Sequence, residues 1–435
     1  MKNFLLMVLG VVSTAVLADP TVGSVTVSQL WPFESSVRVE YVLSGVTDPV
    51  DVVPTFYDGD IELVARVGTG HADTYSGDLF HVTTDGRHTF TFDPVRLFGV
   101  RGRSLDLRCR LEVSASVIAN ADDVLYKVVD LETGAVDDLR RVDFYNNRYG
   151  SFTTDFASFK GAGSTAPWTT DLEDVLIWTG VNENPVFKDR LLALRYVPAK
   201  GKTFVMGTDS PDSGAKPAHA VMLTNDYYFS VFPVTQRQYF RIKGNYGNFN
   251  TNEESMAAYG GYLPVAAGTP KTLRGEIAAD DHEFKADTFF DLLNKKTRAK
   301  LLCDIPTEAR WEYAARAGTT NNIYNNSFDA SDGAVGAWPA VVGSTKPNAF
   351  GIYDLMGGME QWTASGWETY EAAVQDKDLP LIEPIGSDLL EDWASHSATS
   401  GSGGSPGGSN RFVNVPARRK RTTGEVTFHI WAIVP

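Results

Sequence analysis

This chain contains very little cysteine and has no excess of positive charge. Only two of its 435 residues are cysteines, Cys109 and Cys303. They are too few and too far apart in sequence for a disulfide scaffold or a cysteine-based zinc ribbon. The 39 Lys and Arg residues are outnumbered by 54 Asp and Glu, which gives a formal net charge of -15. A field of that sign repels nucleic-acid phosphates and anionic lipids, so we expect neither as a partner.

Long apolar runs are also missing, except at the N-terminus. Residues 1–18 carry one cation, Lys2, followed by mostly apolar residues that end at Ala18. This pattern predicts a cleavable secretory signal. A membrane anchor is the alternative, but the stretch from Phe4 to Leu17 is shorter than the roughly 20 residues that a spanning helix needs. We therefore expect a secreted, periplasmic or cell-surface protein with no membrane span after signal removal.

Apolar and polar residues alternate along the N-terminal part of the mature chain. In Val37–Leu43 and in His88–Phe92 every second residue is apolar or aromatic. This period of two predicts half-buried strands, and turn signals such as Asp58-Gly59 keep the strands short. We therefore predict an all-β sandwich of immunoglobulin-like type over residues 19–116.

The next segment, residues 117–187, is less regular. We expect it to connect the sandwich to a second unit, because at about 150 residues per domain 435 residues make two or three units. Within it Leu125–Leu131 has the pattern of a strand and could join a neighbouring sheet.

Two helices are predicted in the C-terminal half from their capping residues. Thr235 is placed to cap one helix, with Gln238 returning a bond to the amide of the cap. Thr307 is placed to cap the other, and Gly318 is the expected left-handed stop. The chain that follows is rich in Gly, Asn, Trp and Tyr without helical or strand periodicity. We therefore expect ordered loops on a small scaffold there.

Four segments of this half, in this order, resemble the sulfatase-modifying-factor family, the family of the formylglycine-generating enzyme. The resemblance extends from about Leu191 to Pro435. It implies an α+β fold with a C-type-lectin-like, sulfatase-modifying-factor domain, which we place at residues 188–435. The four segments are Phe204–Thr208, Pro233–Tyr239, Ile305–Arg316 and Pro347–Gly357.

The resemblance also says which chemistry to look for. Copper-using oxidases of this family hold Cu(I) through two closely spaced cysteines near the C-terminus, and soft thiolates suit that ion. Here no cysteine follows Cys303. Iron-dependent relatives need a histidine triad, and no two histidines here stand at metal-ligand spacing, although a long-range trio of His219, His282 and His396 stays open. We therefore predict no catalytic residues, and neither copper nor iron.

Calcium is the one cofactor that the resemblance leaves in place. Catalytic members hold a structural Ca²⁺ in a loop that here runs from Asp354 to Trp362. The match implies side-chain oxygens from Asp354 and Gln361, and carbonyl oxygens from Gly357 and Met359. Calcium accepts six to eight oxygen ligands and tolerates a neutral one such as glutamine. An ordered turn without metal is the alternative.

The function predicted from the sequence is that of a secreted pseudoenzyme. Its second domain would be a non-catalytic binding or scaffolding module that presents residues of about 363–410 to an extracellular glycan, peptide or protein. The aromatic residues of the loop-rich region could stack on a ligand or fill the core under the loops; they are Trp338, Trp362, Trp367, Tyr370 and Trp393. The alternative is a formylglycine-generating-type or iron-dependent oxidoreductase with a rearranged site, and a third possibility is a structural part of a surface assembly.

Overall fold

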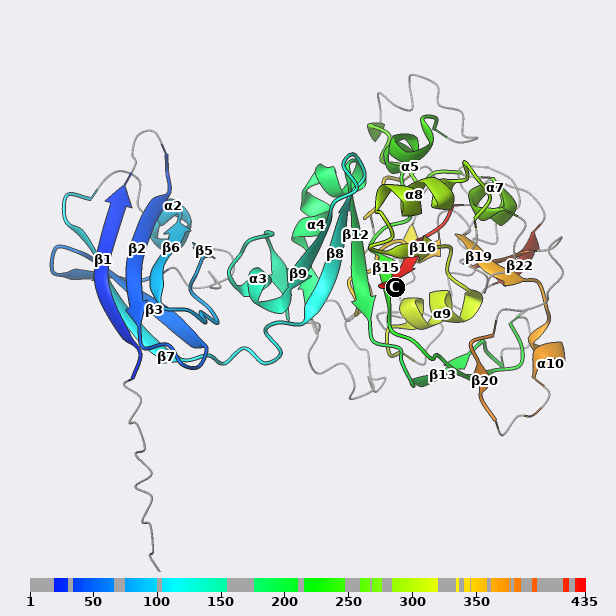
Figure 1. The fold of residues 1–435 in the computed structure, drawn as a ribbon, viewed down its shortest axis with the longest axis horizontal. Coiled ribbons are helices and arrows are strands. Elements are labelled where there is room, and N and C mark those ends of the chain that lie inside the picture. Colours follow the sequence, from blue (N-terminus) through cyan, green and yellow to red (C-terminus); the bar gives the residue numbers. More distant parts are fainter. Residues whose placement is uncertain are drawn as a thin grey trace, which may run out of the picture. The chain divides into compact units, whose positions relative to one another are not determined.

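The computed structural model describes two compact units (Figure 1). The first comprises the chain up to Ala121 together with Val142–Arg148, and the second comprises Asp122–Arg141 with Tyr149–Pro435. The predicted signal, residues 1–18, lies outside the described residues. The described residues are 19–29, 34–65, 75–99, 104–154, 176–209, 215–246, 259–266, 268–275, 284–319, 334–335, 340–344, 346–357, 361–374, 376, 379–384, 393–396, 418–421 and 427–435.

The first unit consists of two sheets that share one core. Its strands are β1 (Thr21–Gln29), β2 (Val37–Ser44), β3 (Val50–Asp58), β4 (Ile61–Leu63), β5 (Tyr75–Gly77), β6 (Gly86–Phe92) and β7 (Leu107–Ala115). They form a four-stranded sheet in the order β1-β2-β6-β5 and a three-stranded sheet in the order β4-β3-β7. Tyr41 and Phe90 of one sheet pack with Phe56 of the other in a single apolar cluster. The predicted alternation is confirmed in β2, where Val37 and Val39 are buried and Arg38 is exposed.

One short helix interrupts this arrangement of strands. Helix α2 (Pro94–Phe98) begins because the Asp93 carboxylate accepts from the amides of Val95 and Arg96, and because Pro94 suits the first helical position. It ends at Gly99 in the left-handed conformation, with φ 75°. None of the described helices in the chain is long and apolar enough to cross a membrane.

A six-stranded antiparallel sheet is the centre of the second unit. Its strands are β8 (Val124–Asp130), β9 (Val136–Arg140), β12 (Leu191–Val197), β15 (Tyr227–Ser230), β16 (Leu302–Asp304) and β23 (Trp431–Ile433). Their order is β16-β23-β15-β12-β8-β9. Strands β8 and β9 come from the expected connecting segment, and Val129 pairs with Leu192. The strand at Leu125–Leu131 therefore does join a neighbouring sheet, and this part of the segment belongs to the second unit.

Helices cover both faces of the central sheet. The helices of the second unit are α4 (Gly180–Glu183), the 3-10 helix η3 (Pro185–Lys188), α5 (Gln236–Lys243), α7 (Pro270–Arg274), α8 (Phe289–Lys296), α9 (Glu308–Arg316) and α10 (Tyr370–Ala373), while α3 (Arg141–Tyr145) lies mostly in the first unit. Consecutive strand residues point to opposite faces. Tyr228 accordingly packs in a cluster with Leu293 of α8, whereas Phe229 packs in a second cluster with Trp311 of α9. Figure 1 shows α8 and α9 on opposite sides of β16.

Several small sheets complete the second unit. Three strands form one of them, in the order β13-β14-β20, and three form another, in the order β19-β21-β22, while β10 pairs with β11 and β17 with β18. Their bounds are β10 (Phe152–Thr153), β11 (Ile177–Trp178), β13 (Thr203–Met206), β14 (His219–Met222), β17 (Ala334–Val335), β18 (Met356–Gly357), β19 (Gln361–Gly366), β20 (Leu381–Ile382), β21 (Trp393–His396) and β22 (Arg418–Arg421).

Both predicted helix caps are confirmed. Thr235 and Gln238 form a reciprocal capping box at the start of α5. The Thr307 hydroxyl accepts from the amide of Arg310 at the start of α9, at 3.3 Å. Helix α9 ends at Arg316 with Ala317 as its left-handed cap, φ 43°, and the predicted Gly318 that follows is left-handed too, with φ 83°.

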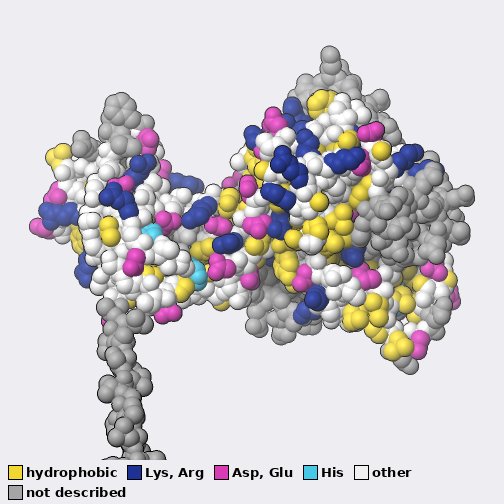
Figure 2. All heavy atoms as spheres, viewed as in Figure 1, with side chains coloured by type: hydrophobic (Ala, Val, Ile, Leu, Met, Phe, Trp, Pro, Cys, Tyr) yellow, Lys and Arg dark blue, Asp and Glu magenta, His cyan; other side chains and the backbone are white. Residues whose placement is uncertain are grey.

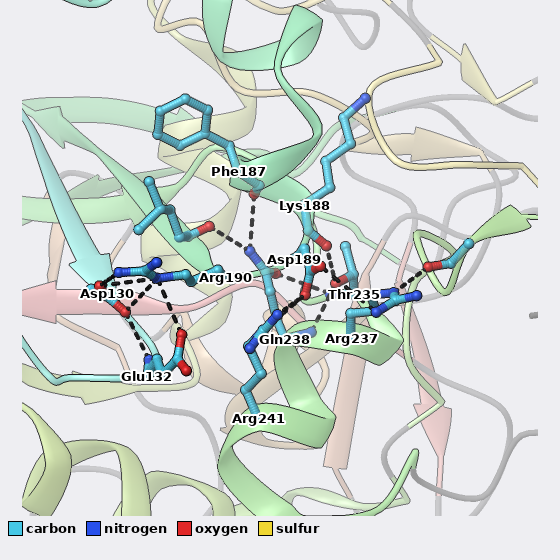
Figure 3. A network of polar contacts seen from close by, with 12 residues as sticks. Asp130, Glu132, Phe187, Lys188, Asp189, Arg190, Thr235, Arg237, Gln238 and Arg241 are labelled. Atoms are coloured by element: carbon cyan, nitrogen blue, oxygen red, sulfur yellow. Dashed lines mark hydrogen bonds and ion pairs between the residues drawn. The ribbon is translucent and has the colours of Figure 1, made fainter.

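The capping box also fixes α5 to the turn that precedes β12 (Figure 3). The side-chain amide of Gln238 donates to the carbonyls of Phe187 and Leu191, both at 3.0 Å. In the same turn the Asp189 carboxylate accepts from Arg241 of α5 at 2.8 Å. These bonds satisfy buried polar groups at the junction of helix and strand, so the network is structural.

Candidate functional site

Neither cysteine is placed for thiol chemistry. Cys303 lies on β16, an edge strand of the central sheet, and is fully buried. Burial, assisted by the nearby Asp304 charge, raises the pKa of its thiol to about 12. Cys109 belongs to the first unit, and burial likewise raises the pKa of its thiol to about 12. Because the thiolate is the reactive species and the metal ligand, both side chains are in their inert, protonated form at neutral pH.

The predicted calcium loop is held together by protein groups at the two positions that can be described. Gln361 is 1% exposed, and its amide nitrogen donates to the carbonyl of Asp354 at 2.7 Å. Its amide oxygen accepts from the indole nitrogen of Trp311 at 2.7 Å. Asp354 has a left-handed backbone with φ 56°, and its carboxylate accepts from the amide of Gly343. Both side chains that were predicted as calcium ligands therefore already have protein partners.

The other two predicted calcium ligands cannot be placed in the same way. Gly357 lies on β18, of which only the backbone is described, and Met359 lies outside the described residues. Lys188 is half-buried, and burial lowers the pKa of its ammonium. The nearby Asp354 charge acts in the opposite direction and raises this pKa, but by less. A protein cation thus already acts on the Asp354 carboxylate. Calcium stays a prediction.

The histidine trio of the iron alternative is only partly visible. His219 lies on β14, whereas His282 and the side chain of His396 are outside what the structure describes. Among the described residues, no group of three His, Cys, Asp or Glu side chains lies close enough together to hold a metal ion.

A pocket opens beside His219, between the β13-β14-β20 sheet and the start of α9. His219 is 8% exposed, and its Nδ1 lies 2.9 Å from the carbonyl oxygen of Pro217. Since a carbonyl can only accept, Nδ1 is the donor in this contact. The ring packs edge-on against Tyr370, with centroids 4.7 Å apart. The pocket is lined by Met206, His219, Glu308, Glu368, Tyr370, Ala373, Leu381 and Pro384.

One wall of the pocket is fixed by a buried link between two of the sequence motifs. The Glu312 carboxylate on α9 accepts from the amide of Gly207 at 2.8 Å, and Arg316 donates to the carbonyl of Gly207 at 2.9 Å. Arg316 also donates to Glu312 at 2.6 Å. Gly207 has φ 81°, and a Cβ there would lie 2.5 Å from the carbonyl oxygen of Ala215. The link holds Met206, the residue before Gly207, in the pocket wall.

The opposite wall comes from the starts of α9 and α10. Glu308 opens α9, is 4% exposed, and donates its amide to the hydroxyl of Ser365 at 3.0 Å. Thr369 caps α10 by accepting from the amide of Ala372, which sets Tyr370 against His219. The sequence analysis considered His219 only as an iron ligand and missed this pocket, because its walls come from segments up to 178 residues apart, from Met206 to Pro384.

Two of the aromatic residues considered for ligand stacking, Trp362 and Tyr370, lie inside the unit, whereas Trp367 is only partly buried. Trp362 is fully buried and donates its indole N–H to the carbonyl of Gly268. Tyr370 is 5% exposed. Of the two roles that were left open, Trp362 has that of core filling, whereas Tyr370 also lines the pocket beside His219.

Comparison with known proteins finds relatives of the second unit. The model of the sulfatase-modifying factor enzyme 1-like domain matches residues 190–429. A formylglycine-generating enzyme of Bos taurus is 24% identical over 251 residues, which are 46% of this chain and 66% of that protein. An inactive C-alpha-formylglycine-generating enzyme 2 of Mus musculus is 29% identical over 224 residues, 40% of this chain and 69% of that one. The chain thus spans about two thirds of the length of each relative.

A solved structure, that of PvdO from Pseudomonas aeruginosa, also matches this chain. It has 20% sequence identity and a TM-score of 0.39, and the match covers 55% of this chain and 94% of that one.

Proposed function

Because the chain belongs to the sulfatase-modifying factor enzyme 1-like family, we propose that it is a non-catalytic member that binds a ligand outside the cell. The second unit would be the binding or scaffolding module, with a C-type-lectin-like architecture, and its ligand would be a glycan, peptide or protein. A structural calcium ion at Asp354 and a secreted or cell-surface location are parts of the same proposal.

The state of the thiols is the single observation that carries this proposal. The family's copper oxidases need two neighbouring thiolates, and here one thiol is buried in the central sheet while the other lies in a different unit. No cysteine follows Cys303 in the remaining chain. A relative that is named inactive among the matches supports the idea that the fold can serve without catalysis.

The first unit would be an immunoglobulin-like spacer or second binding module. Its four-stranded sheet has the order β1-β2-β6-β5, which corresponds to strands A, B, E and D of an immunoglobulin domain. Strands β3 and β7 would then correspond to C and F of the opposite sheet.

The test is turnover after metal loading. The purified chain would be incubated with Cu(I) or Fe(II), oxygen and a cysteine-containing peptide, and followed by oxygen uptake and by mass spectrometry of the peptide. We expect no formylglycine or sulfoxide product, and the same baseline for Cys303→Ser. Stoichiometric copper or iron with product formation would overturn the proposal and favour the oxidoreductase alternative.

A further inference from the structure

We propose that the first unit binds a second copy of this chain edge to edge, through antiparallel pairing of strand β7 with β7 of the other copy. The two-fold axis would pass beside Leu111, so that the two β4-β3-β7 sheets join into one continuous sheet. This inference goes beyond the proposed function and does not depend on it, because it concerns the first unit alone.

The first reason is that the outer edge of β7 presents backbone groups without a strand partner. β7 is the last strand of its sheet and pairs with β3 on one side. At one end of this ladder Ser116 donates its amide to the carbonyl of Pro49 at 2.9 Å. At the other end Gly59 donates its amide to the carbonyl of Asp106 at 3.0 Å.

These two end bonds show which residues of β7 face the open edge. Hydrogen-bonded pairs alternate along an antiparallel ladder, so the even-numbered residues of β7 bond to β3. The odd-numbered residues, such as Leu111 and Val113, therefore point their N–H and C=O groups to the open edge. No described residue bonds to the backbone of these odd-numbered residues.

Three features that often protect an edge strand are missing from β7, namely a proline, a bulge and an inward-pointing charge. The strand is nine residues long, and its pairing with β3 is regular throughout. The other edge strands of the unit differ, because β4 and β5 have three residues each and β1 is irregular between Val22 and Val25. A long, regular and unpaired edge is where a sheet accepts a further strand.

The second reason is that the inward side chains at this edge are incompletely covered. Leu111 and Val113 pack against the core of the sandwich but are only partly buried. In the neighbouring strand β3, Val52 and Phe56 are each 1% exposed. Strand β1 of the opposite sheet lies near β7 but pairs only with β2. A strand added to β7 would cover the remaining apolar surface with its own inward side chains, which is favourable.

The third reason is the charge pattern on the outer face of β7, which selects a second copy as the partner. The side chains of Arg110 and Glu112 are 68% and 63% exposed, and they pair with each other at 2.9 Å. Around a two-fold axis at Leu111, Arg110 of each copy stands opposite Glu112 of the other, in the non-hydrogen-bonded pairs whose side chains lie closest. Moving the axis by one residue would place Arg110 or Glu112 opposite itself, so like charges would meet.

The same register also matches the inward side chains of the two copies. Leu111 stands opposite Leu111 of the other copy, and Cys109 stands opposite Val113. On the face of the first unit seen in Figure 2, charges of both signs are interspersed and hydrophobic side chains are few and scattered. A face of that kind does not drive association by burial of apolar area. The edge of β7 supplies backbone hydrogen bonds and apolar contacts together.

The experiment measures self-association of the full chain by analytical ultracentrifugation over a range of concentrations. We expect a reversible monomer–dimer equilibrium. Hydrogen exchange should show that the amides of Leu111 and Val113 become protected as the dimer forms. A chain that stays monomeric up to millimolar concentration would overturn the inference, and so would a dimer in which these amides exchange as they do in the monomer.

Charge reversals test the register. Arg110→Glu and Glu112→Arg should each weaken the dimer at least tenfold, because like charges then face each other across the axis. An equimolar mixture of the two variants, in which opposite charges face each other again, should associate within threefold of the wild type. The double variant Arg110→Glu/Glu112→Arg should do the same.

Arg108→Glu is the matched control. Arg108 is exposed on the same face and the substitution changes the charge equally, but in this register Arg108 stands opposite Ser114 of the other copy. We expect its effect on the dimer to stay below threefold. Equal weakening by Arg108→Glu and Arg110→Glu, or a mixture that fails to associate although both variants keep the native melting temperature, would overturn the inference.

Discussion

Gln361 of β19 accepts the indole N–H of Trp311 on α9 at 2.7 Å, and this bond joins the predicted metal loop to the centre of the second unit. The same amide donates to the carbonyl of Asp354. A carboxylate at this position could accept but could not donate. The glutamine therefore lets the loop close through protein groups.

This relationship gives a test of the calcium proposal. Gln361→Glu removes the donor to Asp354 and places a charge in a buried site, so we expect the free energy of unfolding to fall by about 1–3 kcal/mol in the presence of a chelator. If calcium can bind at Asp354, added calcium will restore part of the loss in the variant. Equal melting temperatures for the variant and the wild type in chelator would contradict the structural role assigned to Gln361.

The link at Gly207 predicts a steric effect. Gly207→Ala places a Cβ 2.5 Å from the carbonyl oxygen of Ala215 at a residue with φ 81°. Left-handed strain alone costs about 1–2 kcal/mol, and the clash adds to it. Gly201→Ala is the control, because Gly201 has φ 71° but no atom within 4 Å of the added Cβ. Chemical denaturation should show a larger loss for Gly207→Ala; equal losses would argue against the tight packing described here.

The ion pair between Arg274 and Asp304 is buried, and the two side chains are 0% and 1% exposed. Arg274 donates to the Asp304 carboxylate from Nη2 at 2.8 Å and from Nε at 2.9 Å. Arg274→Met leaves the carboxylate without its cation in the core, and we expect a loss of about 3–5 kcal/mol in the free energy of unfolding. Lys295→Met, which breaks the exposed pair with Asp291, should cost less than about 1 kcal/mol. Similar losses for the two variants would show that the Arg274 pair is not desolvated.

His429 predicts a pH dependence of stability. It is fully buried, Nδ1 donates to the carbonyl of Ser230 at 3.0 Å, and Nε2 has no partner among the described residues. Burial lowers the pKa of His429 to about 3, against an ordinary value of 6.5. Between these two values the unfolded chain binds a proton that the folded chain does not, so this residue makes stability fall as the pH drops from 6.5 toward 3.

The measurement is the free energy of unfolding at several pH values for the wild type and for His429→Asn, which keeps a donor near Nδ1. We expect the wild type to lose up to about 1.4 kcal/mol per pH unit more than the variant in this window. Parallel curves would mean that His429 titrates alike in both states.

Local signals in the sequence were enough for much of the scaffold. The alternation in β2, the capping box of Thr235 and Gln238, and the cap at Thr307 depend on neighbours within a few residues, and each is confirmed. At the end of α9 the predicted left-handed Gly318 is confirmed, but Ala317 before it is left-handed as well, a conformation that glycine adopts more easily.

The family and the shortage of thiols follow from the sequence alone, since both depend on residue identity and order. Only the tertiary structure decided that strands β8 and β9 join the sheet of the second unit, that the Gln361 amide is held by Trp311 and Asp354, and that His219 faces a pocket with two carboxylates. Each of these depends on groups brought together from segments far apart in the chain, and their chemistry depends on burial and hydrogen-bond geometry, which residue order does not specify.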